Sequence, residues 1–120
     1  MQRVKDYLSQ FARDMNERRL DRMPAHYTDD FSAVVDGAFV NREDYLRWIG
    51  ELDQAGYSGI RFDVAKCRPL SDDYLLAEGT TSIRAADGTE LSSKFSIICV
   101  AHGARLQFLH AHSSTQKAPV

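Results

Sequence analysis

The sequence predicts an α+β domain in which helical segments come first and a sheet of long strands comes last. Apolar residues recur at three- and four-residue steps over residues 2–18 and again over residues 45–52, which predicts amphipathic helices. From residue 59 onward, four strand-like runs separated by turn residues fill the chain, which predicts the sheet. Because helices and strands are segregated, an alternating βαβ arrangement is excluded.

The first helix is predicted over residues 2–18, because its charged side chains fall on other faces than its apolar ones. This segregation indicates a helix that buries one stripe against a sheet. The apolar stripe consists of Val4, Tyr7, Leu8, Phe11 and Met15.

Two short elements are predicted before the next long helix. Asp21 is placed to cap a short second helix. Residues 31–35 and 38–40 then have the composition of strands, and Asp36-Gly37 between them is typical of a tight hairpin turn.

The third helix begins after Asn41, which together with Asp44 resembles a capping box in which Asp replaces the usual Glu or Gln. Gly56 stands where the C-terminal cap of this helix belongs. The apolar stripe between these two ends consists of Tyr45, Trp48, Ile49 and Leu52.

Four strands joined by polar or Gly-containing turns are predicted for the rest of the chain, over residues 59–70, 74–84, 91–101 and 106–114. The third of these strands is apolar on both sides, since Ile97 faces one way and Ile98 and Val100 face the other. A sheet with helices on one face and water on the other would not place Ile and Val on both. We therefore expect a second copy of the chain to cover the second face, giving a homodimer through the sheet face.

The 120 residues suffice for one domain, predicted over residues 1–115 with a frayed tail at 116–120. Apolar residues make up 43% and charged residues 27% of the chain, which excludes a disordered class. The longest apolar run, residues 97–101, is too short to cross a membrane. A net charge of −2 gives no electrostatic footprint for nucleic acid.

The N-terminus starts directly in amphipathic pattern, with no secretory signal, so a cytoplasmic protein is expected. Cys67 and Cys99 lie inside predicted strands and lack CxxC spacing, so both are expected to be reduced, buried and without a functional role. Residues at metal-ligand spacing are not seen either, so we predict no metal and no cofactor.

Two segments carry a resemblance to a known family. The stretch from Leu20 to Asp30 resembles the helix-to-strand passage of the NTF2-like superfamily, in particular its SnoaL-like branch. The ending from Gly103 to Ser114 is similar to the closing strand of that branch, and also to the last strand of the association domain of calmodulin-dependent protein kinases. In element order the resemblance covers nearly the whole chain.

The resemblance implies a cystatin-like, cone-shaped half-barrel, in which a curved antiparallel or mixed sheet wraps around three N-terminal helices. It also implies a pocket between the helices and the concave sheet, and usually a dimer. No single function is implied, because the superfamily includes isomerases, cyclases, dehydratases, hydrolases and association modules.

Catalytic members similar to ketosteroid isomerase place a general-base Asp on the first strand. The aligned position here is Val35, and Asp36 follows one residue later, which would turn its side chain to the opposite face. Because Asp36 precedes Gly37, a turn role is favoured for it. Tyr7 stands where such enzymes carry a tyrosine that donates to an oxyanion, and it equally belongs to the apolar stripe.

The pocket predicted for this chain is mostly apolar. In the association domain the pocket is lined by arginines, and the aligned positions here are Thr81, Ile97 and Ser113, so it would hold no cationic clamp for an anion. The predicted ligand-binding residues are Tyr7, Phe11, Tyr27, Tyr45, Trp48, Glu78, Thr81, Ile97, Gln107 and His110.

Three polar residues have two interpretations each. Glu78 would serve as a base if it faced inward among apolar neighbours, and would have no role on an exposed strand face. His110 and His112 stand two apart on one strand; an interface or structural role is favoured over catalysis, and a metal site lacks a third ligand.

Two functions of different class are therefore expected. The first is a pocket protein for a small hydrophobic or aromatic molecule, with acid–base chemistry of the isomerase or cyclase type as its enzymatic form. The aromatic inner face of the third helix favours it. The alternative is a non-catalytic homodimerisation module, which the lack of a clear acid–base pair favours.

Overall fold

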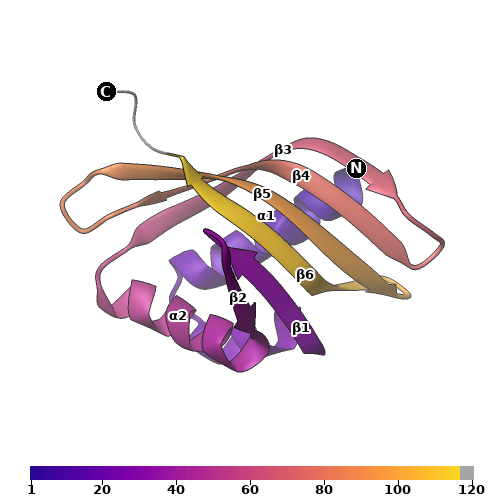
Figure 1. Cartoon of the computed structure of the whole chain (residues 1–120), viewed down its shortest axis with the longest axis horizontal. Helices are drawn as coiled ribbons and strands as arrows, with labels where there is room; N and C mark the ends of the chain where they lie inside the picture. Colours follow the sequence, from indigo (N-terminus) through magenta and orange to yellow (C-terminus); the bar gives the residue numbers. More distant parts are fainter. Residues whose placement is uncertain (117–120) are drawn as a thin grey trace.

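The computed structural model describes residues 1–116 and confirms the α+β class (Figure 1). Its helical elements are α1 (Gln2–Asn16), the 3-10 helix η1 (Leu20–His26) and α2 (Arg42–Gln54). Its strands are β1 (Tyr27–Val35), β2 (Ala38–Asn41), β3 (Ser58–Pro69), β4 (Tyr74–Arg84), β5 (Glu90–His102) and β6 (Arg105–Gln116). None of the helices in the described part of the chain is long and apolar enough to cross a membrane.

The helix ends differ from the predicted ones for local reasons. α1 ends at Asn16 because Arg18 adopts φ 58, which a helix does not accommodate. The second helical segment is a 3-10 helix that starts after Arg19 rather than after Asp21, and Pro24 inside it supplies no amide proton for a longer helix. α2 begins as predicted, since the Asn41 side chain accepts a hydrogen bond of 2.8 Å from the Asp44 amide.

The six strands form one mixed sheet in the order β2-β1-β6-β5-β4-β3. β1 and β6 run parallel, and the other neighbours run antiparallel. β6 continues to Gln116, past the predicted domain end at 115, and the remainder of the predicted tail lies outside the described residues. Figure 1 shows α1 crossing behind β3–β6, while α2 lies beside the β1–β2 hairpin.

The core lies between the helices and the concave face of the sheet. The apolar stripe of α1 packs into one cluster with residues of every long strand, so the amphipathic pattern read from the sequence is confirmed. Buried members of this cluster are Val4, Leu8, Phe11, Met23, Tyr27, Phe31, Ala33, Ile49, Val64, Ala77, Phe95, Ile97, Cys99, Leu106 and Phe108.

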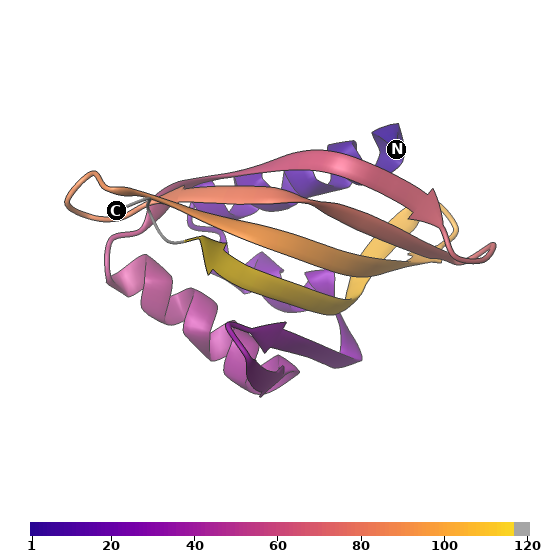
Figure 2. The same cartoon turned by 45° about the horizontal axis from the view of Figure 1, so that its top comes forward.

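A bulge in β6 decides which side chains face this core. Cys99 pairs with Phe108, but the preceding Ile98 pairs with His110, so Leu109 is an extra residue in the strand. As a result Phe108 and Ala111 share the concave face, although they are three residues apart. Figure 2, which turns the molecule by 45°, shows the long strands curving over the helices.

α1 is also joined to the outermost strand by one side chain. The Asn16 carboxamide accepts a hydrogen bond of 2.8 Å from the Ile60 amide and donates one of 3.0 Å to the Ile60 carbonyl. This pair of bonds fixes the end of α1 against the start of β3.

Candidate functional site

The concave face is sealed at one end and half open at the other. Toward the β5–β6 turn, Ala77 and Cys99 are fully buried in the core cluster. Toward the β4–β5 turn, the same face continues past buried Phe95. Its next members are Ser113, which pairs with Phe95 from β6, and Ser93, which lies two residues before Phe95 on β5. Both serines are half-buried, so the helices cover this half of the face incompletely.

We call this half-covered region the concave site. It combines hydroxyl groups with aliphatic side chains, because neighbouring strands place Thr81 beside Ser93 and Ile83 beside Leu91. All of its members are half-buried: Val35, Thr81, Ile83, Leu91, Ser93 and Ser113.

The connection from α2 to β3 meets the β4–β5 turn, beyond the strand ends that carry the concave site. Gly56 follows α2 with φ 86, and a Cβ added there would lie 2.9 Å from Cβ of Ala86 in the β4–β5 turn. Only glycine satisfies both the backbone conformation and the close approach at this position. The connection after α2 and the β4–β5 turn therefore pack closely against each other.

Five of the predicted ligand-binding residues form one chain of aromatic rings with Phe108. Ring centroids lie 5.2 Å apart for Tyr7 and Phe108, and 5.4 Å apart for Tyr27 and Phe108. The chain then extends from Tyr27 to Tyr45 and from Tyr45 to Trp48, each at 5.5 Å. In full, the predicted residues in this chain are Tyr7, Phe11, Tyr27, Tyr45 and Trp48.

The phenols within this chain remain protonated at neutral pH. Burial raises the pKa of Tyr45 to about 12 and raises the pKa of Tyr27 well above its ordinary value, with a smaller contribution from the nearby Tyr45 and Tyr7. Their hydroxyl groups are therefore uncharged. Trp48, at the α2 end of the chain, is 37% exposed, so its ring is accessible from solvent.

A buried hydrogen-bonded chain of three titratable side chains links α1 to η1. The Tyr7 hydroxyl lies 2.8 Å from Nδ1 of His26, and Nε2 of His26 lies 3.0 Å from Oδ2 of Asp14. Asp14 is only 3% exposed, and Gln10 and Arg22 donate to its Oδ1 at 3.1 and 3.4 Å. We refer to this arrangement as the Asp14–His26–Tyr7 chain.

The two ends of this chain hold opposite protonation states. Burial alone would raise the pKa of the Asp14 carboxyl, but the hydrogen bond and charge of His26, with Arg22 and Gln10, outweigh it and bring that pKa below its usual range. Burial raises the pKa of the Tyr7 hydroxyl. In the neutral form of His26, an ionised Asp14 orients the ring with Nε2–H toward the carboxylate, and Nδ1 then accepts a hydrogen bond from the Tyr7 hydroxyl; in the charged form both ring nitrogens donate, and the Tyr7 hydroxyl donates to the His26 carbonyl, 3.3 Å away.

Sequence reasoning missed Asp14 and His26. The prediction that the charged side chains of α1 fall on other faces than its apolar stripe was wrong for Asp14, which stands seven residues after Tyr7 and therefore on the same face. That spacing was the available signal. The partner could not be read from spacing, because His26 reaches Asp14 across the break between α1 and η1.

Glu78 and His110 lie on the convex face of the sheet. This corrects their place among the predicted ligand-binding residues, because a ligand-binding role beside the aromatic chain would need both side chains to point inward. Glu78 follows buried Ala77 in β4, and His110 pairs with Ile98, the neighbour of buried Ile97. Side chains alternate along a strand, so both point away from the core.

The remaining predicted residues lie in separate places. Thr81 belongs to the concave site, and Ile97 is buried in the core. Gln107 lies at the β6–η1 junction, where its Nε2 donates to the carbonyls of Ala25 and Tyr27 at 3.0 and 3.4 Å. Asp36 is a turn residue with φ 48, as the sequence favoured.

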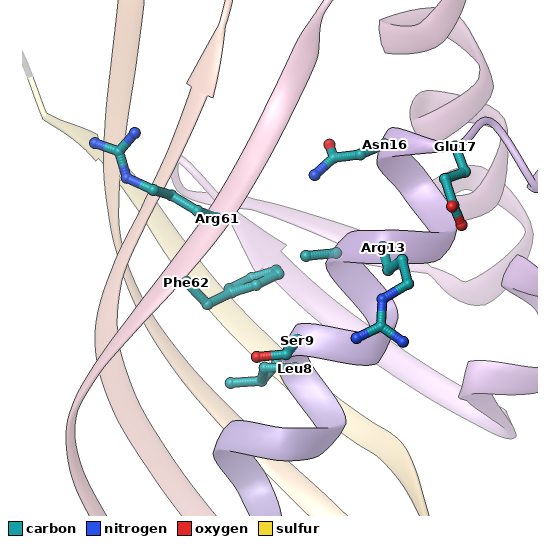
Figure 3. A pocket seen from close by; sticks show the side chains of 8 residues that line it. Leu8, Ser9, Arg13, Asn16, Glu17, Arg61 and Phe62 are labelled. Carbon is teal, nitrogen blue, oxygen red and sulfur yellow. The ribbon is translucent and has the colours of Figure 1, made fainter.

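A surface groove of about 360 Å³ lies between α1 and β3 (Figure 3). Its floor is apolar, with the Phe62 ring directed at α1, and its rim carries Arg13, Glu17 and Arg61. The Arg61 side chain points away from the helix, where its Nη2 lies 2.6 Å from Oε1 of Glu90. None of the predicted ligand-binding residues is among those that line this groove.

One of the two cysteines, Cys99, has the environment of an unreactive thiol. Cys99 is buried, and burial raises the pKa of its thiol to about 12. Cys67 is half-buried and also unpaired. Within residues 1–116, no group of three or more His, Cys, Asp or Glu side chains is arranged to hold a metal ion.

Together, the N-terminal helices and the curved, unclosed mixed sheet that lies over them define an α+β fold with a half-open concave face. Residues 4–118 match the family model of the SnoaL-like domain. The chain belongs to the SnoaL-like domain family. Among curated proteins, no sequence match is found.

Solved structures with the same fold cover nearly the whole chain. An NTF-2-like protein of unknown function from Shewanella oneidensis has a TM-score of 0.77 at 14% identity, over 94% of this chain and 97% of that one. A putative calcium/calmodulin-dependent protein kinase II association domain from Xanthomonas campestris has a TM-score of 0.79 at 12% identity, over 94% and 85%. A ketosteroid isomerase-like protein from Erwinia carotovora atroseptica has 0.74 at 13% identity, over 96% and 95%. These likenesses show an NTF2-like fold.

Proposed function

We propose that the chain binds one small, largely apolar and uncharged molecule at the concave site. The observation that carries this proposal is the change along a single sheet face from full burial at Ala77 and Cys99 to half-burial at Thr81, Ser93 and Ser113. A SnoaL-like fold often binds small molecules, which supports the same reading.

The chemistry of the concave site sets the ligand class. Its aliphatic members offer apolar surface, and its three hydroxyls offer hydrogen bonds that do not require a charged partner. A positively charged side chain is not among the six residues that form it, so an anionic group would be desolvated there without compensation. The preferred ligand is therefore neutral, with one or two polar atoms.

Binding of naphthol and naphthoate, a matched neutral and anionic pair, tests the proposal by calorimetry and Trp48 emission. Naphthol is expected to bind at least about ten-fold more tightly than naphthoate, since burying an unpaired charge costs more than 1.4 kcal/mol. Ser93→Leu should abolish naphthol binding by filling the site. Ser92→Leu is the matched control, because Ser92 is the adjacent residue on the convex face.

Equal losses in Ser92→Leu and Ser93→Leu, or no naphthol binding to the folded wild-type chain, would overturn the proposal. A further panel of enolisable ketones, followed by proton exchange with solvent, tests for the enzymatic form. Exchange that is lost in Tyr7→Phe would assign acid–base chemistry to the Asp14–His26–Tyr7 chain, which lies at the sealed end of the concave face and apart from the concave site.

Self-association is the second candidate function, and a specific observation favours it. The convex face presents apolar side chains that the helices of the described chain leave uncovered: Tyr74 is 40% exposed, and Leu76, Ile98 and Val100 are half-buried. The likeness to a kinase association domain supports the same proposal. Ile98→Asp should convert a dimer to a monomer in sedimentation, whereas Leu70→Asp, an exposed position outside this face, should not.

The proposed compartment is the cytoplasm. Two unpaired thiols, Cys67 and Cys99, support this proposal, since free buried cysteines are typical of a reducing environment. Subcellular fractionation of the native protein tests it directly.

A further inference from the structure

We propose that the surface groove between α1 and β3 binds a medium-chain fatty acid, with its carboxylate held by Arg13 and its alkyl chain lying over Ala12 and Phe62. None of the six residues of the concave site lines this groove. Phe62 pairs with Thr81, so its ring stands between the two places. The inference therefore concerns a second site and goes beyond the proposed function.

The groove offers a strip of apolar surface that runs along α1. Leu8 and Ala12 lie one helical turn apart on one side of it, and the Phe62 ring, directed at α1, lies on the other (Figure 3). This ring is held in place by Phe11 and Phe95, whose ring centroids are each 5.8 Å away. Covering a continuous apolar strip with an alkyl chain is favourable in proportion to the area removed from water.

The dimensions of the groove fit a small molecule rather than a protein segment. Its volume of about 360 Å³ lies at the lower end of the range for small-molecule sites. From the level of Ser9 to that of Asn16, α1 rises about 10 Å, a distance that an extended chain such as that of octanoate spans. A stable protein interface needs a far larger surface than the residues lining this groove present.

Two of the three charged side chains on the rim of the groove are compensated by neighbours. Nη2 of Arg61 lies 2.6 Å from Oε1 of Glu90, and the Arg61 side chain points away from the helix (Figure 3). Oε2 of Glu17 lies 3.4 Å from Nη2 of Arg19. Each of these pairs adds no net charge to the rim.

Arg13 is the third charged side chain, and it is available to an anion. Its Nη1 donates at 3.0 Å to Oε1 of Gln10, a neutral acceptor, and no carboxylate of residues 1–116 forms an ion pair with it. Its guanidinium folds back along α1 to the level of Ser9, whose hydroxyl points toward β3 (Figure 3). A carboxylate placed there accepts charge-assisted hydrogen bonds from the guanidinium and a further one from the hydroxyl.

One uncompensated positive charge beside an apolar strip selects a monoanion with an apolar chain. A short acid such as acetate would gain only an ion pair at an exposed site, which is weak. An alcohol with the same chain as octanoate would keep the apolar contact but leave Arg13 without an anion. A fatty acid makes both contacts at once, so it should bind more tightly than either.

Titration of the isotope-labelled full chain with octanoate, followed by NMR, tests the inference. Saturable shifts are expected at the backbone amides of Ser9, Arg13 and Phe62. Octanoate should bind at least about ten-fold more tightly than octanol, which cannot form the charge-assisted hydrogen bonds to Arg13. It should exceed acetate by a similar factor, because acetate lacks the alkyl chain.

Two arginines on the same rim give a matched pair of variants. Arg13→Gln should weaken octanoate binding at least about five-fold, because it removes the charge that is available to the carboxylate. Arg61→Gln is the control, since that guanidinium points away from the helix and is already paired with Glu90. Ser9→Glu should abolish binding, because its carboxylate occupies Arg13. All three wild-type side chains are exposed, so each variant should fold, which circular dichroism confirms.

The outcomes separate this inference from the proposed function. If Ser93→Leu, which fills the concave site, abolishes octanoate binding, or if Arg13→Gln and Arg61→Gln weaken it equally, the inference is overturned. Octanol binding as tightly as octanoate, or no saturable shifts in the folded wild type, also overturns it. Naphthol binding should be the same in Arg13→Gln as in the wild type, because it belongs to the concave site. If naphthol does not bind at all, only the proposed function fails.

Discussion

Two carboxylates of this chain, Asp14 and Asp36, both have a lowered pKa, for different reasons. Asp36 is fully exposed, and the amide and hydroxyl of Thr115 donate to it at 2.6 and 2.7 Å, which lowers its pKa directly. Asp14 is buried, so its pKa is lowered only because His26, Arg22 and Gln10 more than offset the loss of solvent.

The comparison shows that a similar set of hydrogen bonds has different energetic consequences in the two places. If Asp36 loses its partners, water replaces them. If Asp14 or His26 loses its partner, the remaining group stays buried without one, and that penalty is several times the net value of an exposed bond. Four predictions test this difference, from the largest expected effect to the smallest.

Asp14→Ala should lower the free energy of unfolding by about 3–5 kcal/mol, because it leaves His26 buried without its carboxylate. Urea denaturation followed by circular dichroism measures the change. A loss below about 1 kcal/mol would show that Asp14 is solvated in the folded protein.

Lowering the pH should reduce the stability difference between the wild type and Asp14→Asn. The lowered pKa of Asp14 stabilises the fold fully above the unfolded-state pKa, about 3.9, and this contribution is lost as the pH falls through the lower folded-state value. Urea midpoints of both proteins at a series of pH values test this. A constant difference below about pH 4 would contradict the assigned charge state.

Tyr7→Phe should cost about 1 kcal/mol of unfolding free energy, since it removes one hydrogen bond to Nδ1 of His26 but keeps the ring packed on Phe108. Tyr57→Phe, after the end of α2 and outside both the buried chain and the convex face, is the control and should change nothing. Thermal unfolding of the two variants side by side is sufficient. Equal effects would mean that the Tyr7 bond is not part of the buried chain.

Asp36→Asn should have the smallest effect, a slight drop in the melting temperature that is well below that of Asp14→Asn. Asparagine tolerates the left-handed conformation of this residue, φ 48, and still accepts one hydrogen bond. Calorimetry of both variants makes the comparison. A drop as large as that of Asp14→Asn would remove the distinction between exposed and buried carboxylates.

Much of the fold could be predicted from the sequence because its signals are local. The bounds of β4, Tyr74–Arg84, agree with the predicted strand, since polar turn residues stand on both sides of it. The cap at Asn41 and the positive φ of Gly56 also follow from residue type at a helix end. The aromatic chain follows from helical spacing on α1 and α2.

Which side chains of β6 point toward the core could not be predicted, because a bulge leaves no mark in the sequence pattern. Simple alternation places Phe108, His110 and His112 on one face, but the extra residue Leu109 moves both histidines to the other. The contact between Asp14 and His26 was out of reach for a similar reason. It depends on how η1 folds back onto α1, which no local spacing encodes.

Asn16 has a consequence for encounters between molecules. β3 is the last strand of the sheet, and the free N–H and C=O groups of an outer strand are a template on which another chain can add a strand. Because the Asn16 carboxamide already occupies both backbone groups of Ile60, an incoming strand would have to displace it before pairing there. One amide side chain thus obstructs the addition of a strand at the start of β3.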